Sequence, residues 1–503
     1  MILGFLHTPT HRVMVDPLDN ITPELAHALA AFGHDDLGNA ERLAYLYGDR
    51  IMWVPGIGWH HFDGCRWAPD SLAEVPRLAA RMVRALLMVA GMLDGDDARD
   101  RMAKHAIRSA KGRSIAIALD KLRDEQEVKR VGVLADALDA APHLLNVANG
   151  TVDLRTGELK PHDPRDLITK LAPVAYDPNA TAPLWDAFQR AIANGDDELV
   201  AFKQRAFGYT ATGETGEQVF FIAHGAGSNG KTTELELVAE VLGDYAVATF
   251  FATFASHPRS AVHRFGMAGL AGARFVRATE GDAGARLAEG TVKAATGSKA
   301  IAAEFKGRDV FTFRPRFTLW LGTNHRPETR GTDHGLWRRV RLVPYPVRFE
   351  DATEANPTPA HPIDRELPSK LRDELPGILA WIVVGARAWY THGLGHVRAV
   401  TDATDEYRAD KDVLGDFVRD CIDTSDPDAR ESAKRVHDAH VGHAREQRRP
   451  TLDLAGLKAA MNERGLRAKR LNTGQVWLGV KLTPDGDTFA DAANAATTGP
   501  YDR

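Results

Sequence analysis

The chain has 503 residues, of which 44% are hydrophobic and 26% are charged, and its formal net charge is −5. This length exceeds one ordinary hydrophobic core and predicts two to four domains. No apolar run approaches the ~18 residues that a membrane span needs, so no membrane partner is expected. The negative charge excludes a globally basic protein, and nucleic acid could be bound only through local basic surfaces.

The beginning of the chain predicts helices around a small hairpin. Thr22 precedes a proline, the pattern of a helix N-cap, and aromatic-rich strands flank the Asp63-Gly64 turn. His60 and His61 are adjacent strand residues that point to opposite faces, which argues against one shared metal ion. Residues 72–129 predict further helices. Their basic residues are typical of a solvated face, and a DNA-facing side is the alternative: Arg77, Arg81, Arg84, Arg101, Lys104, Arg108, Lys111 and Arg113.

Further along, two turns and two cysteines bear on the fold and the compartment. The turns at 149–150 and 156–157 bracket a short strand and predict a small meander. Cys65 and Cys421 are far apart, which excludes a CxxC-type zinc site and offers no disulfide framework. Because the first residues also lack the pattern of a signal peptide, we expect a protein of the cytoplasm.

A phosphate-binding loop is the strongest local signal in the sequence. An apolar strand at 220–224 leads into a glycine-rich turn and then into a helical pattern, the context that the G-x-x-x-x-G-K-[ST] motif requires. Lys231 is expected to reach the β- and γ-phosphates of ATP, and the Thr232 hydroxyl is expected to bind magnesium. The predicted nucleotide-binding residues are Gly225, Ala226, Gly227, Ser228, Asn229, Gly230, Lys231, Thr232 and Thr233.

Three later positions complete a predicted NTPase site. The strand at 273–279 ends in Glu280, the main candidate for organising magnesium and activating water, with Asp282 as the second. Asn324 ends another apolar strand and could sense the γ-phosphate, whereas a turn-forming asparagine is the alternative. Arg338 and Arg339 suit an arginine finger that acts on a neighbouring subunit, with a surface salt-bridge pair as the alternative.

The order of these motifs resembles the superfamily 3 helicase domain of phage and plasmid primase-helicase proteins. The likeness rests on the phosphate loop, Glu280, the sequence Thr323-Asn324-His325-x-Pro327, and Asp333-x-x-x-Trp337-Arg338-Arg339. Upstream, the residues around Asn149-Gly150 and Gly208-Tyr209 look like the poxvirus-type amino-terminal region of these proteins. The resemblance covers roughly residues 40–350.

The resemblance implies an AAA+ ATPase that forms a homo-hexameric ring. Such a ring threads single-stranded DNA, usually moves 3′ to 5′, opens forked DNA, and binds ATP and magnesium between subunits. Lys231 and Thr232 then match the phosphate-binding positions, Glu280 the acidic strand end, Asn324 the sensor, and Arg338 or Arg339 the finger.

Within the resemblance, the family's central hairpin should fall between Ile301 and Phe313. Its tip carries Lys306 and Arg308, expected to contact DNA phosphates. Phe305 could stack on a base, but packing is the favoured interpretation.

The sequence departs from the family in two respects. The first ~40 residues are too short for the primase domain of the larger relatives, so a separate primase or polymerase is the expected partner in a bacterial host cell. Glu280 is followed by Gly281-Asp282 rather than by an adjacent acid, which leaves the role of Asp282 open.

The residues after the ATPase predict a helical lid and a small winged-helix-like module. Helices are expected at about 376–391, 401–422 and 432–446, with Thr451 capping another through Met461. A basic hairpin around 472–474 carries Lys469 and Arg470, candidates for the DNA backbone; an oligomerisation module is the alternative. The histidines of the 432–446 helix are expected on its surface: His437, His440 and His443.

The predicted architecture is therefore multidomain α/β. It comprises an extension (1–40), a mixed α+β amino-terminal region (41–205), an AAA+ ATPase with a parallel sheet (206–350), a helical lid (351–424), the winged-helix-like module (425–490) and a flexible tail (491–503). The predicted function is an ATP-driven replicative DNA helicase. An origin-binding initiator and a partner-regulated ATPase are the alternatives.

Overall fold

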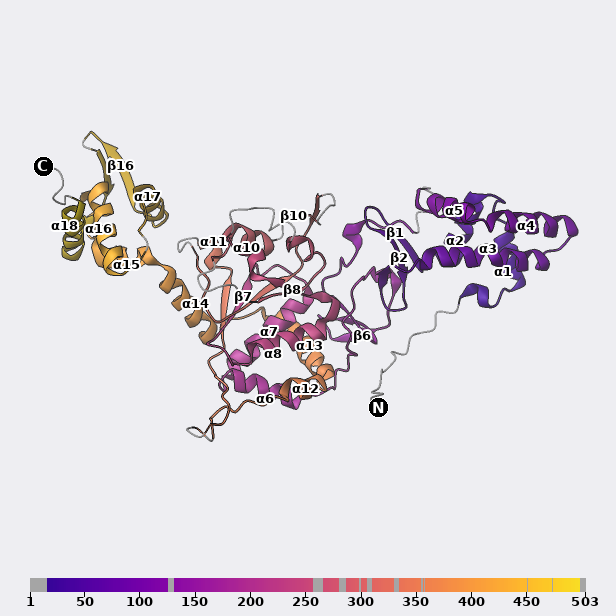
Figure 1. Cartoon of the computed structure of the whole chain (residues 1–503), viewed down its shortest axis with the longest axis horizontal. Helices are drawn as coiled ribbons and strands as arrows, with labels where there is room; N and C mark the ends of the chain where they lie inside the picture. The colour runs from indigo at the N-terminus through magenta and orange to yellow at the C-terminus, as the bar shows by residue number, and fades with distance from the viewer. Residues whose placement is uncertain are drawn as a thin grey trace.

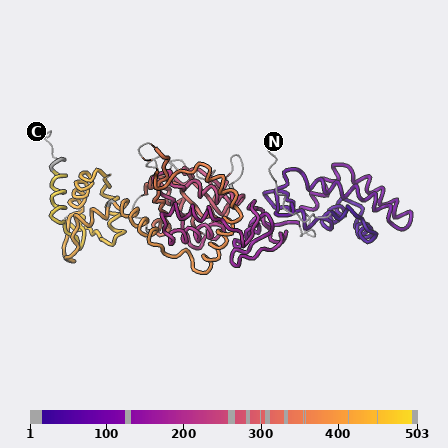
Figure 2. The backbone as a smooth tube through the Cα atoms, turned by 90° about the horizontal axis from the view of Figure 1, so that it is seen from below, coloured from indigo at the N-terminus to yellow at the C-terminus, as the bar shows by residue number. Residues whose placement is uncertain are grey.

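The computed structural model describes residues 16–124, 131–256, 266–279, 286–297, 300–304, 310–329, 334–353, 356, 358–449, 451–472 and 474–497. The chain is elongated, with a helical region near the N-terminus, a central unit built on a sheet, and a separate C-terminal module (Figures 1 and 2). No helix among the described residues is long and apolar enough to cross a membrane.

The N-terminal region is a helical bundle that carries a small antiparallel sheet. Its core contains Leu43, Met82 and Leu86, and Thr22 caps its first helix as predicted, since its hydroxyl accepts a hydrogen bond from Leu25 N. The Asp63-Gly64 turn lies between β2 and β3 as expected. The elements are α1 (Pro23–Ala30), α2 (Asp36–Tyr47), β1 (Ile51–Val54), β2 (Gly58–Phe62), β3 (Trp67–Pro69), α3 (Glu74–Met92), α4 (Asp96–Ser109) and α5 (Gly112–Asp124).

A three-stranded meander connects this bundle to the central unit. It consists of β4 (Leu144–Val147), β5 (Gly150–Asp153) and β6 (Glu158–Lys160), paired antiparallel in that order. The two predicted turns lie between its strands. The buried Arg274 guanidinium, from the loop before β9, donates to the carbonyls of Leu144 and Ala211, so the meander is fixed to the central sheet.

The central unit is a five-stranded parallel sheet in the order β13-β7-β12-β9-β8. Because side chains alternate along a strand, Phe221 and Ala223 of β7 face one core, and Phe220 and Ile222 face the other. The strands are β7 (Phe220–His224), β8 (Ala246–Phe250), β9 (Phe275–Thr279), β12 (Thr318–Thr323) and β13 (Val340–Pro344). This confirms the predicted parallel-sheet core.

Helices cover both faces of this sheet. The face of Phe221 is covered by α6 (Pro183–Ile192), α7 (Asp197–Thr212), α8 (Lys231–Leu242), α12 (Leu367–Arg372) and α13 (Leu375–His392). The opposite face is covered by α10 (Glu289–Ala295) and α11 (His334–Trp337). Helix α14 (Arg398–Lys411) lies along the edge strand β13, where Leu342 N donates to Thr404 Oγ1, and it contributes Val400 to one core and Tyr407 to the other.

Helix α7 runs through the predicted domain boundary at 205/206. It packs closely on α13, where a Cβ on Gly208 would lie 2.0 Å from the backbone nitrogen of Ala386. The helix is thus part of the core of the central unit. The local sequence pattern does not show that one helix spans this position.

The C-terminal module has its own core, around Phe417, Val436, Leu457 and Trp477. The helix expected at 401–422 is two helices, and the second belongs to this module. The module contains α15 (Val413–Cys421), β14 (Ile422–Asp423), β15 (Arg430–Ser432), α16 (Ala433–Glu446), α17 (Leu454–Glu463), β16 (Arg467–Leu471), β17 (Gly474–Leu478), β18 (Lys481–Leu482) and α18 (Pro484–Thr497). Its main sheet has the order β15-β17-β16.

Three expectations for this module were wrong. Asp453 caps α17 instead of Thr451. His440 and His443 are buried rather than on the surface, and their rings contact that of Phe417. The residues expected to form a flexible tail from 491 are helical as far as Thr497.

Candidate functional site

The predicted phosphate loop has the expected strand, turn and helix. β7 ends at His224 and α8 begins at Lys231, with Gly227, Ser228 and Gly230 all at positive φ. Gly230 is constrained both by its positive φ and by its surroundings, because a Cβ there would lie 2.6 Å from the side chain of Ile192 in α6. The first N–H groups of α8 have no intrahelical acceptors and can receive an anion.

Lys231 and Asn324 meet at the centre of the site. Lys231 Nζ is buried and lies 2.8 Å from Asn324 Oδ1 and 3.3 Å from the Gly225 carbonyl oxygen. Because β12 pairs directly with β7, the register of Thr323 with His224 brings Asn324 beside the loop. The ammonium thus donates to oxygen atoms of Gly225, Asn229 and Asn324, which suits a group that would bind phosphate oxygens. The sequence predicted this pair from two separate motifs.

The other predicted loop residues are distributed around this pair. Asn229 is buried and packs on Gly225, where a Cβ would lie 2.1 Å from its Nδ2 atom. Thr232 is exposed on the first turn of α8, where its hydroxyl could bind magnesium, whereas Thr233 is half-buried. The burial of His224 before the loop, with the nearby charges of Arg326 and Lys231, lowers its pKa.

Four predicted residues lie outside the described part of the chain. They are Glu280 and Asp282, expected to act on magnesium and water, and Lys306 and Arg308, expected to contact DNA. The structure describes β9 as far as Thr279, which pairs with Gly322 near the end of β12, the strand that precedes Asn324. The arms of the hairpin are described as β10 (Ile301–Glu304) and β11 (Val310–Phe313). Among the described residues there is no group of three metal-ligating side chains.

Arg338 and Arg339 lie at the opposite end of the sheet from the phosphate loop. They precede β13, whose Val340 pairs with Phe220 at the start of β7, whereas the loop follows the end of β7. At about 3.3 Å per residue, the five-residue strand separates them from the loop by roughly 15 Å. Neither arginine is therefore positioned to reach the nucleotide site of its own chain.

The two arginines differ in their surroundings. Arg339 is 9% exposed, and its guanidinium donates to the Gly335 carbonyl at 2.5 Å and to Gln218 Oε1 at 3.2 Å. Burial and the charge of Arg338 lower the pKa of Arg339. Arg338 is exposed, with a 3.3 Å hydrogen bond to Gln218. Arg338 is thus available to a neighbouring molecule, whereas Arg339 is held by its own chain.

A buried ion pair behind the loop was not predicted. Lys203 of α7 and Glu234 of α8 lie 2.8 Å apart, and the Tyr345 hydroxyl donates to the same carboxylate. Burial lowers the pKa of Lys203, which Glu234 opposes, and raises the pKa of Tyr345. The Tyr345 carbonyl oxygen would be 2.6 Å from a Cβ on Gly225, so this group of three side chains borders the loop.

A second missed feature connects the sensor to α14. Arg326, two residues after Asn324, pairs with Glu406 at 3.1 Å and with Asp410. The buried Tyr407 hydroxyl donates to the Pro327 carbonyl at 2.5 Å. Helix α14 is therefore held directly against the segment that follows the sensor residue.

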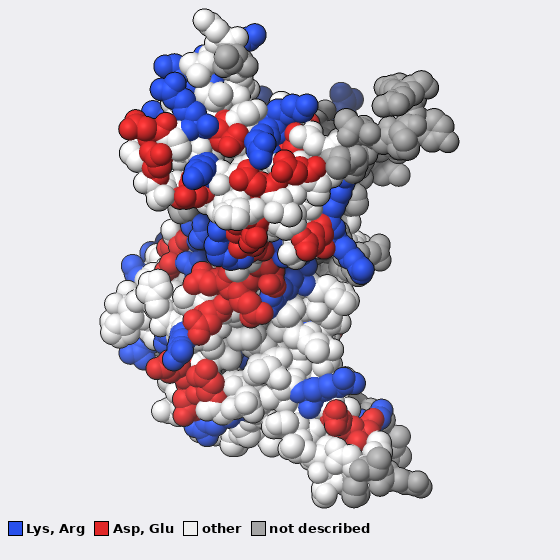
Figure 3. Space-filling model, turned by 90° about the vertical axis from the view of Figure 1, so that its left-hand side faces the viewer, with Lys and Arg blue, Asp and Glu red and all other residues white. Residues whose placement is uncertain are grey.

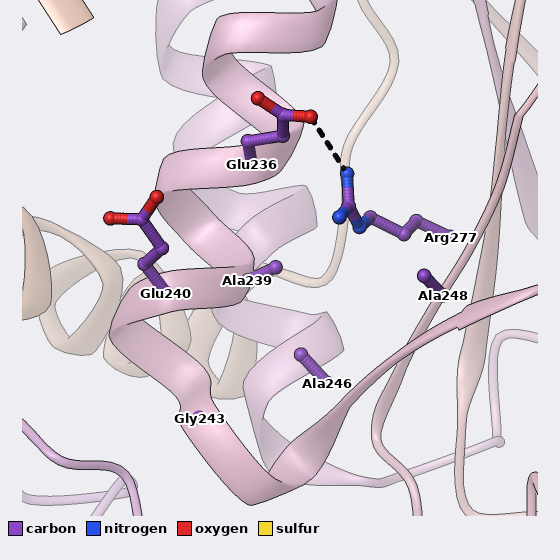
Figure 4. Close-up of a pocket in the computed structure, with 7 residues that line it drawn as sticks. All are labelled: Glu236, Ala239, Glu240, Gly243, Ala246, Ala248 and Arg277. Carbon is purple, nitrogen blue, oxygen red and sulfur yellow. Dashed lines mark hydrogen bonds and ion pairs between the residues drawn. The ribbon is translucent and has the colours of Figure 1, made fainter.

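A groove of 470 Å³ lies between α8 and the sheet edge at β8 (Figure 4). Ala239, Ala246 and Ala248 line it together with Glu236, Glu240 and Arg277. Arg277 lies 3.5 Å from Glu236, and Glu240 pairs with Arg372 outside the groove. Since two carboxylates line it, this groove does not suit a nucleotide phosphate.

The predicted DNA contacts of the C-terminal module lie on an exposed hairpin. Lys469 and Arg470 of β16 are exposed and pair in register with Val476 and Gln475 of β17. No ion pair is recorded for either residue among the described part of the chain. Figure 3 looks onto this end of the molecule, where Lys and Arg side chains are interspersed with acidic ones.

Two protein-family models match parts of this chain. Residues 40–193 match the family "D5 N terminal like". Residues 223–339, which include the phosphate loop, Asn324 and both arginines, match a family of unknown function, DUF5906. These matches, with the relatives below, support a relationship to D5-like primase-helicase proteins.

Several viral proteins named as helicases or primases are similar to this chain. A helicase-named protein of Acanthamoeba polyphaga mimivirus is 27% identical over 298 residues, covering 57% of this chain and 31% of the relative. One from Frog virus 3 is 25% identical, covering 66% and 41%. A primase-named protein of African swine fever virus is 26% identical, covering 49% and 26%. The chain thus spans less than half the length of these relatives.

Among solved structures, the C-terminal region of NrS-1 in its apo form is similar at 10% identity. The match covers 61% of this chain and 77% of the other, with a TM-score of 0.37. A TM-score this low does not establish a shared fold.

Proposed function

We propose that this chain is an ATP-dependent DNA helicase of replication. The observation that carries the proposal is the 2.8 Å contact between Lys231 and Asn324, because it brings a phosphate-loop lysine and a polar strand end together. The strand order supports it, since the sensor strand β12 lies between the loop strand β7 and β9. The helicase names of the viral relatives give the substrate class.

The roles of the residues follow from their positions. Bound ATP with magnesium supplies the anhydride whose hydrolysis drives movement. Lys231 neutralises the β- and γ-phosphates, the α8 amides bind them, and Thr232 holds the metal. Asn324, at 2.8 Å from Lys231, would orient the γ-phosphate or the attacking water when Lys231 binds phosphate. The role of polarising the water is assigned to Glu280, with Asp282 as the second candidate.

The finger is assigned to Arg338 acting on a neighbouring chain. Its exposure and its distance from its own loop support action between subunits, as in the AAA+ hexamer that we propose. Lys306 and Arg308 would hold single-stranded DNA in the ring, with movement 3′ to 5′. A separate primase or polymerase would supply primers, and the host is a bacterial cell.

An origin-binding initiator is the second candidate. The observation in its favour is the separate C-terminal module with its exposed Lys469 and Arg470. The order of elements from α15 to β17, which is a helix, two short strands, two helices and a hairpin, supports a winged-helix-like duplex reader. In that case ATP binding would drive assembly on a specific site.

Forked DNA with either a 3′ or a 5′ single-stranded arm tests these candidates. With ATP and magnesium, the wild-type chain is expected to open only the fork with the 3′ arm, and Lys231→Ala is expected to open neither. Lys170→Ala is the control, because this lysine lies outside the loop. DNA-dependent hydrolysis without fork opening, together with a sequence-specific footprint, would favour the initiator. Hydrolysis indifferent to DNA would contradict both.

A further inference from the structure

The basic residues of the N-terminal bundle divide into paired and unpaired groups. Arg77 lies 3.5 Å from Glu74, and Lys104 lies 2.6 Å from Asp100. Arg81 pairs with Asp16 and Asp19. Within the described residues, by contrast, no ion pair is recorded for a second group, which is exposed on α4 and the start of α5: Arg101, Arg108, Lys111 and Arg113.

The unpaired group is concentrated on one side of α4. Arg101 and Arg108 are seven residues apart, so they lie on one face of the helix, two turns from each other. His105 lies between them, and the His34 ring stacks on it with centroids 5.2 Å apart and planes within 10°. The positive charges of Arg101 and Arg108 contribute to a lowered pKa of His34, after burial and Arg42.

A fixed cation lies beneath this face. Arg42 is completely buried, and its guanidinium donates to the carbonyls of Leu29, Phe32 and Gly33. Its Nη1 atom is 3.4 Å from His105 Nε2. Among the described residues its guanidinium donates to carbonyls rather than to a carboxylate, and the nearby charges of Asp35 and Glu41 favour its charged form, so its charge adds to the field of the exposed arginines.

The acidic side chains near this face have partners or positions of their own. The Asp35 carboxylate accepts the Gly38 N–H at 2.7 Å as the cap of α2. On α4, Asp96 and Asp97 lie in the first turn, and Asp100 pairs with Lys104 at 2.6 Å. The helix dipole explains a basic residue in the last turn, such as Arg108, but not Arg101 in the middle or Lys111 and Arg113 beyond the end.

We propose that Arg101, Arg108, Lys111 and Arg113 form a second nucleic-acid contact, which binds the phosphate backbone of single-stranded DNA without reading its sequence. Side chains of this type give sequence-independent, salt-dependent binding. The half-buried His34 ring, stacked on the buried His105, lies beside them. The surface lies at the end of the molecule remote from the C-terminal module (Figure 1). The proposal depends on the proposed function only for the class of ligand.

Nucleotide-free binding of a fluorescent single-stranded oligonucleotide, followed by anisotropy over a range of salt, tests this surface. The double variant Arg101→Ala/Arg108→Ala is expected to bind about tenfold more weakly, and its salt slope should fall by about 1.4, at about 0.7 for each lost phosphate contact. The matched control is Arg77→Ala/Lys104→Ala, which removes the same charge from paired residues and should leave the slope unchanged.

The outcomes separate this proposal from the helicase proposal. Equal affinity and slope for the double variant and its control would overturn the surface, whatever the ATPase does. A larger loss on duplex than on single strands would overturn the choice of single-stranded DNA. Repeating the titration in the Lys231→Ala chain should give the same difference, because this contact needs no hydrolysis. Unchanged thermal unfolding of both variants excludes misfolding as the cause.

Discussion

Lys203 and Glu234 form an ion pair of 2.8 Å in which both side chains are completely buried. One comes from α7 and the other from α8, so the pair connects the helix before β7 with the helix after the phosphate loop. Lys203 Nζ also lies 4.7 Å from the ring centroid of Tyr345. These contacts fix the back of the loop to the core of the central unit.

Breaking this pair from one side should destabilise the central unit strongly. Lys203→Met leaves Glu234 buried without a cation, which typically costs about 3–5 kcal/mol. Denaturant unfolding measures the loss, and Glu236→Gln on the exposed side of the same helix should change stability by less than about 0.5 kcal/mol. A loss for Lys203→Met as small as that of this control would contradict a stabilising role for the ion pair.

Asn324→Ala should reduce turnover more than ATP binding. Lys231 keeps the Gly225 carbonyl as a neighbour, so the loop still presents its cation, but the γ-phosphate loses a positioned amide. We expect kcat to fall about 100-fold with little change in KM, as when a transition-state hydrogen-bond donor is removed. Asn179→Ala, at an exposed position, is the control. A rise in KM at constant kcat would assign Asn324 to ground-state binding instead.

Arg338 and Arg339 should separate into a functional and a structural residue. Arg338→Ala should lower the ATPase rate at least 1,000-fold, the lower range for an arginine finger, with unchanged thermal stability. Arg339→Ala should lower the melting temperature, since it removes the bonds to Gly335 and Gln218. Mixing Arg338→Ala with Lys231→Ala chains should restore part of the activity, because each supplies what the other lacks. Without recovery, action between subunits is ruled out.

The C-terminal module should lose stability in mild acid because of His440. Burial, followed by the charges of His437 and His443, lowers the pKa of His440 from 6.5 to about 4, and its Nε2 accepts the Leu452 N–H. The unfolded chain therefore binds the proton more tightly, so stability is full above pH 6.5 and falls as pH drops toward 4, by about 1.4 kcal/mol per unit.

Hydrogen exchange of α16 at pH 7, 6 and 5 measures this loss in the intact chain. Protection should fall with pH in the wild type and less steeply in His440→Gln, which cannot titrate. His437→Gln is the control, because His437 is more exposed. A pH profile of His440→Gln as steep as the wild type would assign the acid sensitivity to another group.

Local patterns predicted the parts of the fold that depend on neighbours in sequence. The structure confirms the strand, loop and helix around Lys231, the cap at Thr22 and the hairpin carrying Lys469. In each case the residue types of the motif specify the local backbone geometry. Lys231 and Asn324 were each predicted at the phosphate site, but their direct contact was not. The predicted roles of Glu280, Asp282, Lys306 and Arg308 remain predictions.

The missed features involve pairs that are distant in sequence and belong to no motif. Nothing near Lys203 indicates that Glu234, 31 residues later, will face it in the core. A single helix was expected at 401–422, yet the chain turns at Asp412, which ends α14 and caps α15. His440 and His443 were placed on the surface because their spacing does not suit a metal triad, whereas packing against Phe417 buries them.

The break at Asp412 determines how the C-terminal module is attached. One residue joins α14 to α15, and its carboxylate accepts the Gly415 N–H and pairs with Arg464 inside the module. Helix α14 is itself fixed to Arg326 and Pro327 beside the sensor. The module is therefore attached through a fixed helix and not through a flexible linker, which would let it move independently of the central unit. A small rotation of α14 would become a much larger sweep of the hairpin at the far end.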